Sequence, residues 1–413
     1  MRNHMAAGWF YSPEQIVRYF ATRLTSLRPP KTELRNPIHV LNDLDRHQWL
    51  MFSIGFLGWT WDAFDFFTVS LCVTEIATEF KTTNSAVSWG ITITLMLRSV
   101  GALIFGSLSD RYGRKWTMIT NLFLFIIFEL ASGFAQSLPQ FLGVRALYGI
   151  AMGGLYGPAA ATALEDLPYD ARGILSGVYQ QGYAVGYLLA AIFYRAVELG
   201  PTEVTVISVV GQIGALVGGT TIGYVSTFFG RRLSMITCCI IGAAVLPAYT
   251  IPRSLALIAS AFFLQFFVGG AWGPVPIHLS ELSPPALRTT AVGLTYQLGN
   301  LASSAAATIQ ATIGERFPLS PKDGVKRYDY GKVIGIFMAA VWVYMLIFLF
   351  FGPEMTQEER AEYGAAADQI EKMRKDGVSL AEIGAGRAKL AALGDELPRP
   401  NCSEKPTDIE HIE

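Results

Sequence analysis

The sequence is poor in charged residues. Only 16% of its 413 residues are Asp, Glu, Lys or Arg, whereas a soluble domain carries about 25%. Hydrophobic residues make up 51% of the chain and fall in long runs, which indicates a membrane protein. The formal net charge of −1 offers no basic surface to a polyanion, so we expect no nucleic-acid partner.

Cysteine, histidine and catalytic motifs are also scarce. The four cysteines show no Cys-x-x-Cys or other metal-ligand spacing, so we expect neither a disulfide framework nor a metal site. The sequence contains no cluster of histidines, no Gly-x-Ser-x-Gly motif and no nucleotide-binding loop. We therefore predict that the protein is not an enzyme and needs no cofactor.

Long apolar runs are abundant instead. A membrane-spanning helix needs about 20 mostly apolar residues, and ten stretches meet this condition: 48–70, 86–107, 116–136, 139–163, 172–194, 203–226, 233–252, 254–279, 289–313 and 331–352. We predict an all-α membrane protein with about ten spanning helices. Its parts are a leader (1–47), a bundle of five helices (48–200), a second bundle of five (201–352) and a charged tail (353–413).

Basic residues predict the orientation of these helices. The leader holds seven Lys and Arg residues, whereas the loop after the first span holds only Lys81. Short basic loops also follow the second and sixth spans. These sites fall on one side if both termini are cytoplasmic, as the positive-inside rule requires. One loop disagrees, because Arg316, Lys322, Lys326 and Arg327 would then lie outside, although acidic residues are interspersed among them.

The sequence contains an internal repeat. Gly-Gly-Leu-Tyr-Gly-Pro at 153–158 recurs as Gly-Gly-Ala-Trp-Gly-Pro at 269–274, an offset of 116 residues. The same offset relates Glu165 to Glu281, Arg172 to Arg288 and Gln181 to Gln297. Paired repeats of membrane helices are typical of secondary transporters, which bind their substrate between the two halves.

This repeat has a gap. The second to fifth spans pair with the sixth to ninth, so a copy of the first span should end just before residue 203. The fifth span and a short loop occupy that stretch instead. We predict that two helices are missing between about residues 195 and 203, either because the protein is a ten-helix variant or because the sequence is incomplete.

A charged motif lies between the second and third spans: Gly106-x-x-x-Asp110-Arg111-x-Gly113-Arg114-Lys115. Its glycines permit a tight turn, and Asp110 can either sit at the N-terminus of a neighbouring helix or pair with an Arg. Either contact would form a latch that breaks when the two halves rock. We assign gating to the charged residues of this motif and of related loops: Asp110, Arg111, Arg114, Arg145, Glu165, Arg172, Arg231, Glu281 and Arg288.

The motif resembles the loop signature of the major facilitator superfamily. Arg145-x-x-x-Gly149 and Gly153-Gly154 are similar to the motif of that superfamily's fourth helix. The resemblance implies a transporter of two helical bundles, normally with twelve helices in all. We therefore expect the two-bundle fold of this superfamily with about ten helices.

A closer resemblance rests on Trp59-Thr-Trp61-Asp62-Ala-Phe64-Asp65-Phe66-Phe67, Leu97-Arg98-Ser99, Tyr179-Gln180-Gln181-Gly182-Tyr183 and the leader pair Asn36-Pro37. Over about residues 10–355 the chain is similar to the fungal lactate/carboxylate permeases of the sialate/lactate:proton symporter family. This resemblance implies proton-coupled uptake of short mono- or dicarboxylates across the plasma membrane. That family carries a polar substrate signature in its seventh helix, which has no counterpart here and would fall in the gap of the repeat.

Polar residues inside the apolar runs are the candidate substrate site, because ionisable groups in a membrane are costly. Arg98 can hold a carboxylate through two parallel hydrogen bonds. Its alternative role is a structural ion pair with Asp62, Asp65 or Glu129. Neutral amides can line the same cavity, or can hydrogen-bond helix to helix instead; they are Gln180, Gln181, Gln297 and Asn300.

Three acidic residues are candidates for proton coupling. Asp62 and Asp65 are three residues apart and so share a helix face, and Glu129 lies in the third span. The alternative for the two aspartates is that one of them neutralises Arg98 or Arg145.

We expect a carrier of small carboxylates and protons in the lipid bilayer. The alternatives are a sugar-type porter, since Glu281-x-x-Pro-x-x-x-Arg288 also occurs in such carriers, and a truncated homologue that no longer transports.

Overall fold

The computed structural model describes residues 17, 19–27, 35–196, 202–251, 257–283, 287–304, 306, 317–322, 325–328 and 330–354. All of them belong to one compact unit, Met1–Gln357. The second unit, Glu358–Glu413, contains most of the predicted tail and lies outside the described residues.

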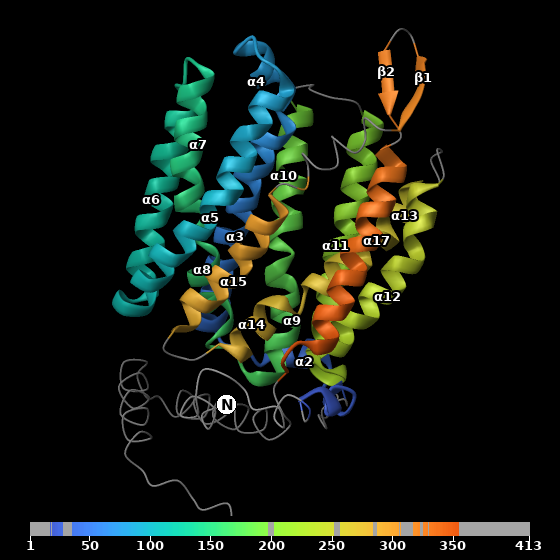
Figure 1. The fold of residues 1–413 in the computed structure, drawn as a ribbon. Coiled ribbons are helices and arrows are strands. Elements are labelled where there is room, and N and C mark those ends of the chain that lie inside the picture. Colours follow the sequence, from blue (N-terminus) through green and yellow to red (C-terminus); the bar gives the residue numbers. More distant parts are fainter. Residues whose placement is uncertain are drawn as a thin grey trace, which may run out of the picture. The chain divides into compact units, whose positions relative to one another are not determined.

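The first half of the chain forms helices at each of the five predicted spans (Figure 1). Short elements η2 (Thr25–Leu27) and α2 (Pro37–Asn42) come before them, and α4 (Val73–Glu79) follows the first span. The spans are α3 (Arg46–Leu71), α5 (Asn84–Tyr112), α6 (Arg114–Gly133), α7 (Leu138–Gly153) with α8 (Tyr156–Leu164), and α9 (Tyr169–Gln180) with α10 (Gly182–Ala196).

The second half follows the same order. Its helices are α11 (Thr202–Phe229), α12 (Arg231–Thr250), α13 (Leu257–Trp272) with α14 (Val275–Leu282), α15 (Arg288–Ser303) and α17 (Tyr330–Phe351). Two short antiparallel strands, β1 (Pro318–Lys322) and β2 (Val325–Tyr328), form a hairpin before α17. The predicted fold class is confirmed, with this hairpin as its one addition among the described residues.

Three of the predicted spans are interrupted helices rather than continuous ones. Pro158 and Pro274 have no backbone N–H, and each ring clashes with the carbonyl four residues earlier. The chain accordingly leaves the helix between α7 and α8 and between α13 and α14. The break between α9 and α10 falls at Gln181, just before Gly182. Five helical segments of the described chain are long and apolar enough to cross a membrane: Ala86–Tyr112, Arg114–Gly133, Val206–Phe229, Arg231–Thr250 and Leu257–Leu282.

The structure repeats itself where the sequence does. Gly113 has φ 91° and ψ 154°, and Gly230 has φ 90° and ψ 149°. This left-handed region is open to glycine at little cost, and each glycine is followed by the first residue of a helix. Arg114 then pairs with Glu165, and Arg231 pairs with Glu281. Equivalent residues of the two halves therefore make equivalent ion pairs.

The two halves meet closely at one end of the bundle, which we call the leader end because the described leader residues 19–27 and 35–43 lie there. The Cα of Thr290 on α15 is so near Gly106 on α5 that a Cβ on the glycine would lie 2.8 Å from it. On the other side, a Cβ on Gly223 of α11 would lie 2.7 Å from the Cα of Gly177 of α9. Two glycine-mediated crossings, related by the repeat, thus join the halves at this end.

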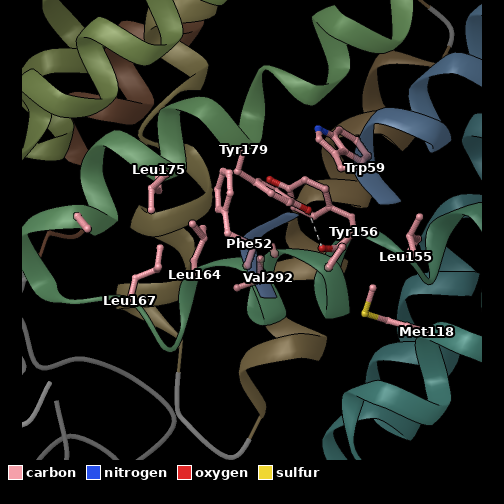
Figure 2. Close-up of a cluster of buried hydrophobic side chains, with 14 of the residues drawn as sticks. Phe52, Trp59, Met118, Leu155, Tyr156, Leu164, Leu167, Leu175, Tyr179 and Val292 are labelled. Atoms are coloured by element: carbon pink, nitrogen blue, oxygen red, sulfur yellow. Dashed lines mark hydrogen bonds between the residues drawn. The ribbon is translucent and has the colours of Figure 1, made fainter. Parts of the chain in front are cut away.

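The main hydrophobic cluster gathers side chains from α3, α7, α8 and α9. Figure 2 shows Phe52, Trp59, Tyr156 and Tyr179 within it, together with Val292 from α15 of the second half. A second cluster joins α12, α13 and α17 around Trp342. The first cluster therefore includes a side chain from across the boundary between the halves.

We predict that glycines at the helix crossings govern stability. At Gly149 on α7 an added Cβ would lie 2.6 Å from the carbonyl oxygen of Thr94 on α5, whereas at Gly143 on the same helix it would meet nothing within 4 Å. Gly149→Ala should therefore destabilise the protein by about 1–3 kcal/mol through overpacking, and Gly143→Ala should not. Thermal unfolding of the two purified variants in one detergent measures this; equal midpoints would contradict the prediction.

Candidate transport site

Arg98 and Asp62 form a fully buried ion pair at the centre of the first half. The Nη2 of Arg98 on α5 donates to the Asp62 carboxylate on α3. The side chains are 2% and 0% exposed. Of the two roles considered for Arg98, the structure therefore displays the ion pair with Asp62; contact with substrate stays a prediction.

Several buried polar atoms of the candidate site residues have no hydrogen-bond partner among the described residues. The Nε of Arg98 and the Oδ1 of Asp62 have no hydrogen-bond partner in the described part of the chain, and neither do the Nε1 of Trp59 and the Nε2 of Gln297. An unmet buried polar group costs about 1–3 kcal/mol. Such groups call for a specific explanation, and a polar ligand or water that completes them is one. Three of these four atoms are N–H donors, so the site is suited to a ligand rich in acceptors.

Gln297 and Asn300 on α15 are hydrogen-bonded to each other, as the sequence predicts for residues that share a helix face. The Oγ of Ser99, the residue after Arg98, donates to the backbone oxygen of Gln297 at 2.9 Å. The Nδ2 of Asn300 donates to the Oε1 of Gln297 at 2.6 Å. The backbone of α15, in the second half, therefore contacts α5 at the residue that follows Arg98.

Gln180 and Gln181 are occupied in helix contacts. The hydroxyl of Tyr156 donates to the Oε1 of Gln180 at 3.2 Å, and the Nε2 of Gln181 donates to the backbone oxygen of Gly269 at 3.4 Å. These contacts match the alternative that the sequence left open, helix-to-helix hydrogen bonding. Gln181 and Gln297 are equivalent in the repeat, yet only Gln297 has an amide nitrogen without a partner among the described residues.

A group of aromatic rings beside the site was missed from the sequence. The rings of Tyr156 and Tyr296 stack with centroids 3.8 Å apart, and the Trp59 ring lies 4.8 Å from the first and 5.5 Å from the second. Trp272 contacts Tyr296 from the other side at 5.9 Å. Tyr156 and Trp272 are equivalent in the Gly-Gly-x-aromatic-Gly-Pro repeat, and this equivalence was the signal that could have identified the group.

Asp65 belongs to a separate network, although it lies one helical turn from Asp62. The hydroxyl of Tyr148 donates to the Oδ2 of Asp65 at 3.1 Å. The guanidinium of Arg145 lies 4.6 Å from the centre of the Tyr148 ring and donates to Glu129 at 2.9 Å. The three acidic candidates for proton coupling are therefore divided between two buried arginines.

Apart from Arg145, which belongs to the Asp65 network, the gating candidates gather at the leader end. Asp110 accepts hydrogen bonds from the backbone N–H groups of Thr289 and Thr290, at 3.1 and 2.9 Å, and from the Thr290 hydroxyl at 2.6 Å. It thus lies at the N-terminus of α15, where a carboxylate is stabilised by the helix dipole. This is one of the two positions that the sequence predicts for it.

The other charged residues of this group differ in their partners. Glu165 pairs with Arg114 and lies 3.9 Å from Arg288 of the other half, and the Nε of Arg172 donates to the Leu167 carbonyl at 2.9 Å. Arg111 is exposed, with its guanidinium near the Tyr112 ring. Within the described residues, no group of three or more His, Cys, Asp and Glu side chains could hold a metal ion.

Two protein families and a relative in yeast match this chain. The family described as "Sugar (and other) transporter" matches residues 48–202, and the family described as "Major Facilitator Superfamily" matches residues 191–393. The chain is 31% identical to the "Carboxylic acid transporter protein homolog" of Saccharomyces cerevisiae, over 97% of this chain and 84% of the relative. That alignment runs over 520 positions, more than the 413 residues of this chain, so the relative contains segments with no counterpart here.

Other similarities are partial or restricted to the fold. A "Probable 4-methylmuconolactone transporter" of Cupriavidus pinatubonensis is 33% identical over 33% of this chain and 32% of its own length. The solved structure of the proton:xylose symporter XylE superimposes with a TM-score of 0.57 at 16% identity, covering 77% of this chain and 99% of that one. The human organic anion transporter MFSD10 gives 0.58 at 13% identity, covering 74% and 100%.

The relatives named above are transporters, and the match to the yeast relative extends over nearly the whole chain. The chain is a multi-pass membrane transporter and belongs to the major facilitator superfamily.

Proposed function

We propose that the protein carries short-chain carboxylates, such as lactate, pyruvate or related mono- and dicarboxylates, together with protons by alternating access. The observation that carries the proposal is the buried Arg98–Asp62 pair with its unmet hydrogen-bonding atoms. The name of the yeast relative, a carboxylic acid transporter homologue, supports the same substrate class.

The pair suggests how an anion and a proton would move together. A substrate carboxylate and the Asp62 carboxylate compete for one guanidinium, because two anions cannot share a buried cation without excess negative charge. Protonation of Asp62 releases Arg98, which then holds the substrate through charge-assisted hydrogen bonds. Gln297 and Asn300, on the helix that contacts α5 at Ser99, would hold further oxygens of the substrate. One proton would then accompany each bound carboxylate.

The closed leader end indicates which state of the cycle this conformation resembles. The Asp110 cap on α15, the glycine crossings and the hydrogen bond from Ser176 to Gly273 all join the two halves between that end and the middle of the helices. We propose that the leader end faces the cytoplasm of a plasma-membrane protein, as the basic residues indicate. The structure would then correspond to a carrier closed towards the cytoplasm.

A sugar-type porter is the alternative, favoured by the match of residues 48–202 to the sugar transporter family. A neutral sugar offers no charge to Arg98, so a buried guanidinium would have no substrate partner. Competition of labelled lactate by pyruvate but not by glucose supports the carboxylate carrier. Inhibition by glucose alone would favour the sugar porter instead.

We also propose that the chain lacks a pair of helices, which the repeat places between α10 and α11. On α10, Gly182 and Gly186 pack against Trp59, Thr60 and Ala63 of α3. Their repeat equivalents on α15 are Leu298 and Ala302, which are both exposed. No described helix covers this face of α15 as α3 covers α10. The length of the alignment with the yeast relative supports the same conclusion.

Replacement of Arg98 tests the substrate site. Arg98→Lys keeps the positive charge but loses the planar fork that binds a carboxylate at two points. We expect lactate uptake to fall roughly ten- to hundredfold, in line with about 1.5–3 kcal/mol for a hydrogen bond to a charged group. Uptake of labelled lactate is measured in cells with equal amounts of each protein at the surface, and the exposed Lys115→Arg serves as control. Wild-type uptake by Arg98→Lys would refute the proposed role.

A pair of aspartate variants tests the coupling. Asp62→Asn removes the anion that competes for Arg98, so we expect lactate binding to persist while uphill uptake driven by an acid-outside gradient is lost. Asp65→Asn keeps an acceptor for Tyr148 and should remain coupled. Lactate exchange and lactate-driven proton movement in proteoliposomes separate these activities. Loss of coupling in Asp65→Asn alone would move the proton site to the Tyr148–Arg145 network.

Sequencing of the transcript tests the missing helices. If a longer product exists, the additional residues should encode two apolar stretches of about 20 residues each, inserted in the region that codes for Tyr194 to Val204. The second stretch should carry polar residues, because it would be the equivalent of α3. A single transcript without the insertion, whose product still takes up lactate, would establish a working ten-helix carrier.

A further inference from the structure

Side chains bond the backbone carbonyls at the end of α17, those of residues 349–352. The guanidinium of Arg232 on α12 donates to the first two at 2.8 and 2.6 Å. The hydroxyl of Tyr19 donates to the third at 2.5 Å, and the Nη1 of Arg23 donates to the fourth at 2.9 Å. The last carbonyls of a helix have no partner within the helix. Protein donors at four successive carbonyls suit a helix end next to lipid, where an unmet backbone group is costly.

Two of these donors belong to the leader. Residues 19–27, which we call the docked segment, consist of helical residues and turns and lie against the ends of α12 and α17, in dark blue in Figure 1. The Oγ of Ser26 accepts a hydrogen bond from Arg232 at 3.0 Å. Tyr19, Arg23 and Ser26 are spaced by four and three residues, as on one side of a helix. This side of the docked segment is therefore bound to the protein.

A second side of the leader is apolar and exposed. Val17, Phe20 and Leu24 are 68%, 53% and 72% exposed, and their spacing of three and four residues places them together. Thr22 and Thr25 are also exposed, and their spacing from these three residues places them on a different, polar side. A helical segment with an apolar side and a polar side is typical of one that lies in the surface of a membrane.

The apolar side of the leader continues the exposed surface of α17. This helix contains the apolar stretch Gly335–Phe351. Tyr344, Phe348 and Phe351 share one side of it and are 58%, 61% and 41% exposed, so in a membrane they face lipid. The rings of Phe20 and Phe351 meet edge to face at 5.4 Å. A row of exposed aromatic rings therefore leads from a lipid-facing helix onto the docked segment.

The charge of the leader is complementary to anionic lipid. Residues 18–35 include five basic residues and one acidic residue, Glu33. Each Lys or Arg close to a leaflet with anionic headgroups adds to its attraction. Tyr112 and Trp116, at the leader end of α5 and α6, are 64% and 66% exposed. Exposed aromatic rings at the ends of membrane helices are typical of the headgroup level, so this end of the protein is suited to that depth.

We propose that the docked segment lies in the headgroup region of the bilayer, with Val17, Phe20 and Leu24 inserted towards the acyl chains. The partner is a leaflet that contains anionic lipid. A lipid occupant is favoured over a protein because the apolar side continues a lipid-facing surface and the nearby charge is almost all of one sign. This inference rests on the membrane-spanning fold and not on the transported substrate.

Quenching by labelled lipids tests this location. The fluorophore NBD is attached through Leu24→Cys in full-length protein that also carries Cys72→Ser and Cys402→Ser. The protein is reconstituted in vesicles of phosphatidylcholine and phosphatidylserine. Lipids with a spin-label quencher just below the headgroup should reduce the emission at least roughly twofold, because an interfacial helix buries its apolar face about 5–10 Å into this region. Thr22→Cys, on the polar side of the same segment, is the matched control and should be quenched much less.

Three results would overturn the proposal. Equal quenching at the two positions would show that the segment is not inserted by its apolar side. A blue-shifted emission from Leu24→Cys without quenching by lipid would show that protein covers this side, either another part of the chain or a second copy. Unchanged quenching in phosphatidylcholine alone would exclude the role of anionic lipid.

Two controls keep the test independent of folding and of transport. Cys238 and Cys239 are 1% and 2% exposed, so their labelling in the chain without Leu24→Cys would report unfolding. If Leu24→Cys itself unfolds the protein, Val17→Cys takes its place with the same expected quenching. A protein that fails to take up lactate can still pass this test, so this proposal and the proposed function fail separately.

Discussion

The buried guanidinium of Arg98 is the constraint on which the rest of the site depends. A charge at this depth is tolerated only with a partner and close packing around it, and Asp62 supplies the partner. The packing comes from α7, where Gly149 and Gly153 face the backbone of α5 at Thr94 and at Arg98 itself. Small residues on one helix thus allow the neighbouring helix to bring its arginine to α3. The same closeness explains why Gly153 of α7 recurs in the repeat as Gly269 of α13.

At the leader end the two halves make equivalent contacts, but one pair of equivalent residues differs in charge. Both halves use a glycine turn, an Arg–Glu pair and a glycine crossing, but the latch residues differ. Asp110 caps α15 with its carboxylate, whereas its repeat equivalent, Thr227, accepts a hydrogen bond from Arg231 at 3.3 Å. A carboxylate at a helix N-terminus is worth more than a neutral hydroxyl there. The two halves are therefore held together unequally by these two latch residues.

The sequence predicted most of the fold because its signals are long and repeated. The helices were predicted from ten apolar stretches. Their pairing was predicted from the repeat offset of 116 residues and from the glycine turn at Gly113. The helix breaks near Pro158 and Pro274 were not predicted, although proline removes a backbone donor and both residues lie inside predicted spans. The partner of Arg98 could not be chosen from Asp62, Asp65 and Glu129, because helices that are apolar on most faces give no periodicity from which to infer their rotation. Tyr148 stayed hidden for the same reason, whereas the aromatic group around Tyr296 could have been found from the repeat of Tyr156 as Trp272.

The exposed face of α15 bears on whether the Arg98 site can enclose a substrate. The backbone of Gln297 on α15 contacts Ser99, yet Leu298 and Leu301 on the same helix are exposed. In the first half the equivalent surface of α10 is covered by α3, which also provides Trp59 and Asp62 to the site. A carrier must exclude lipid from a charged substrate, since an ion gains nothing from hydrocarbon. Whatever covers α15 therefore decides whether the Arg98 site is a sealed cavity with walls from both halves or a half-site that can bind a carboxylate but not enclose it.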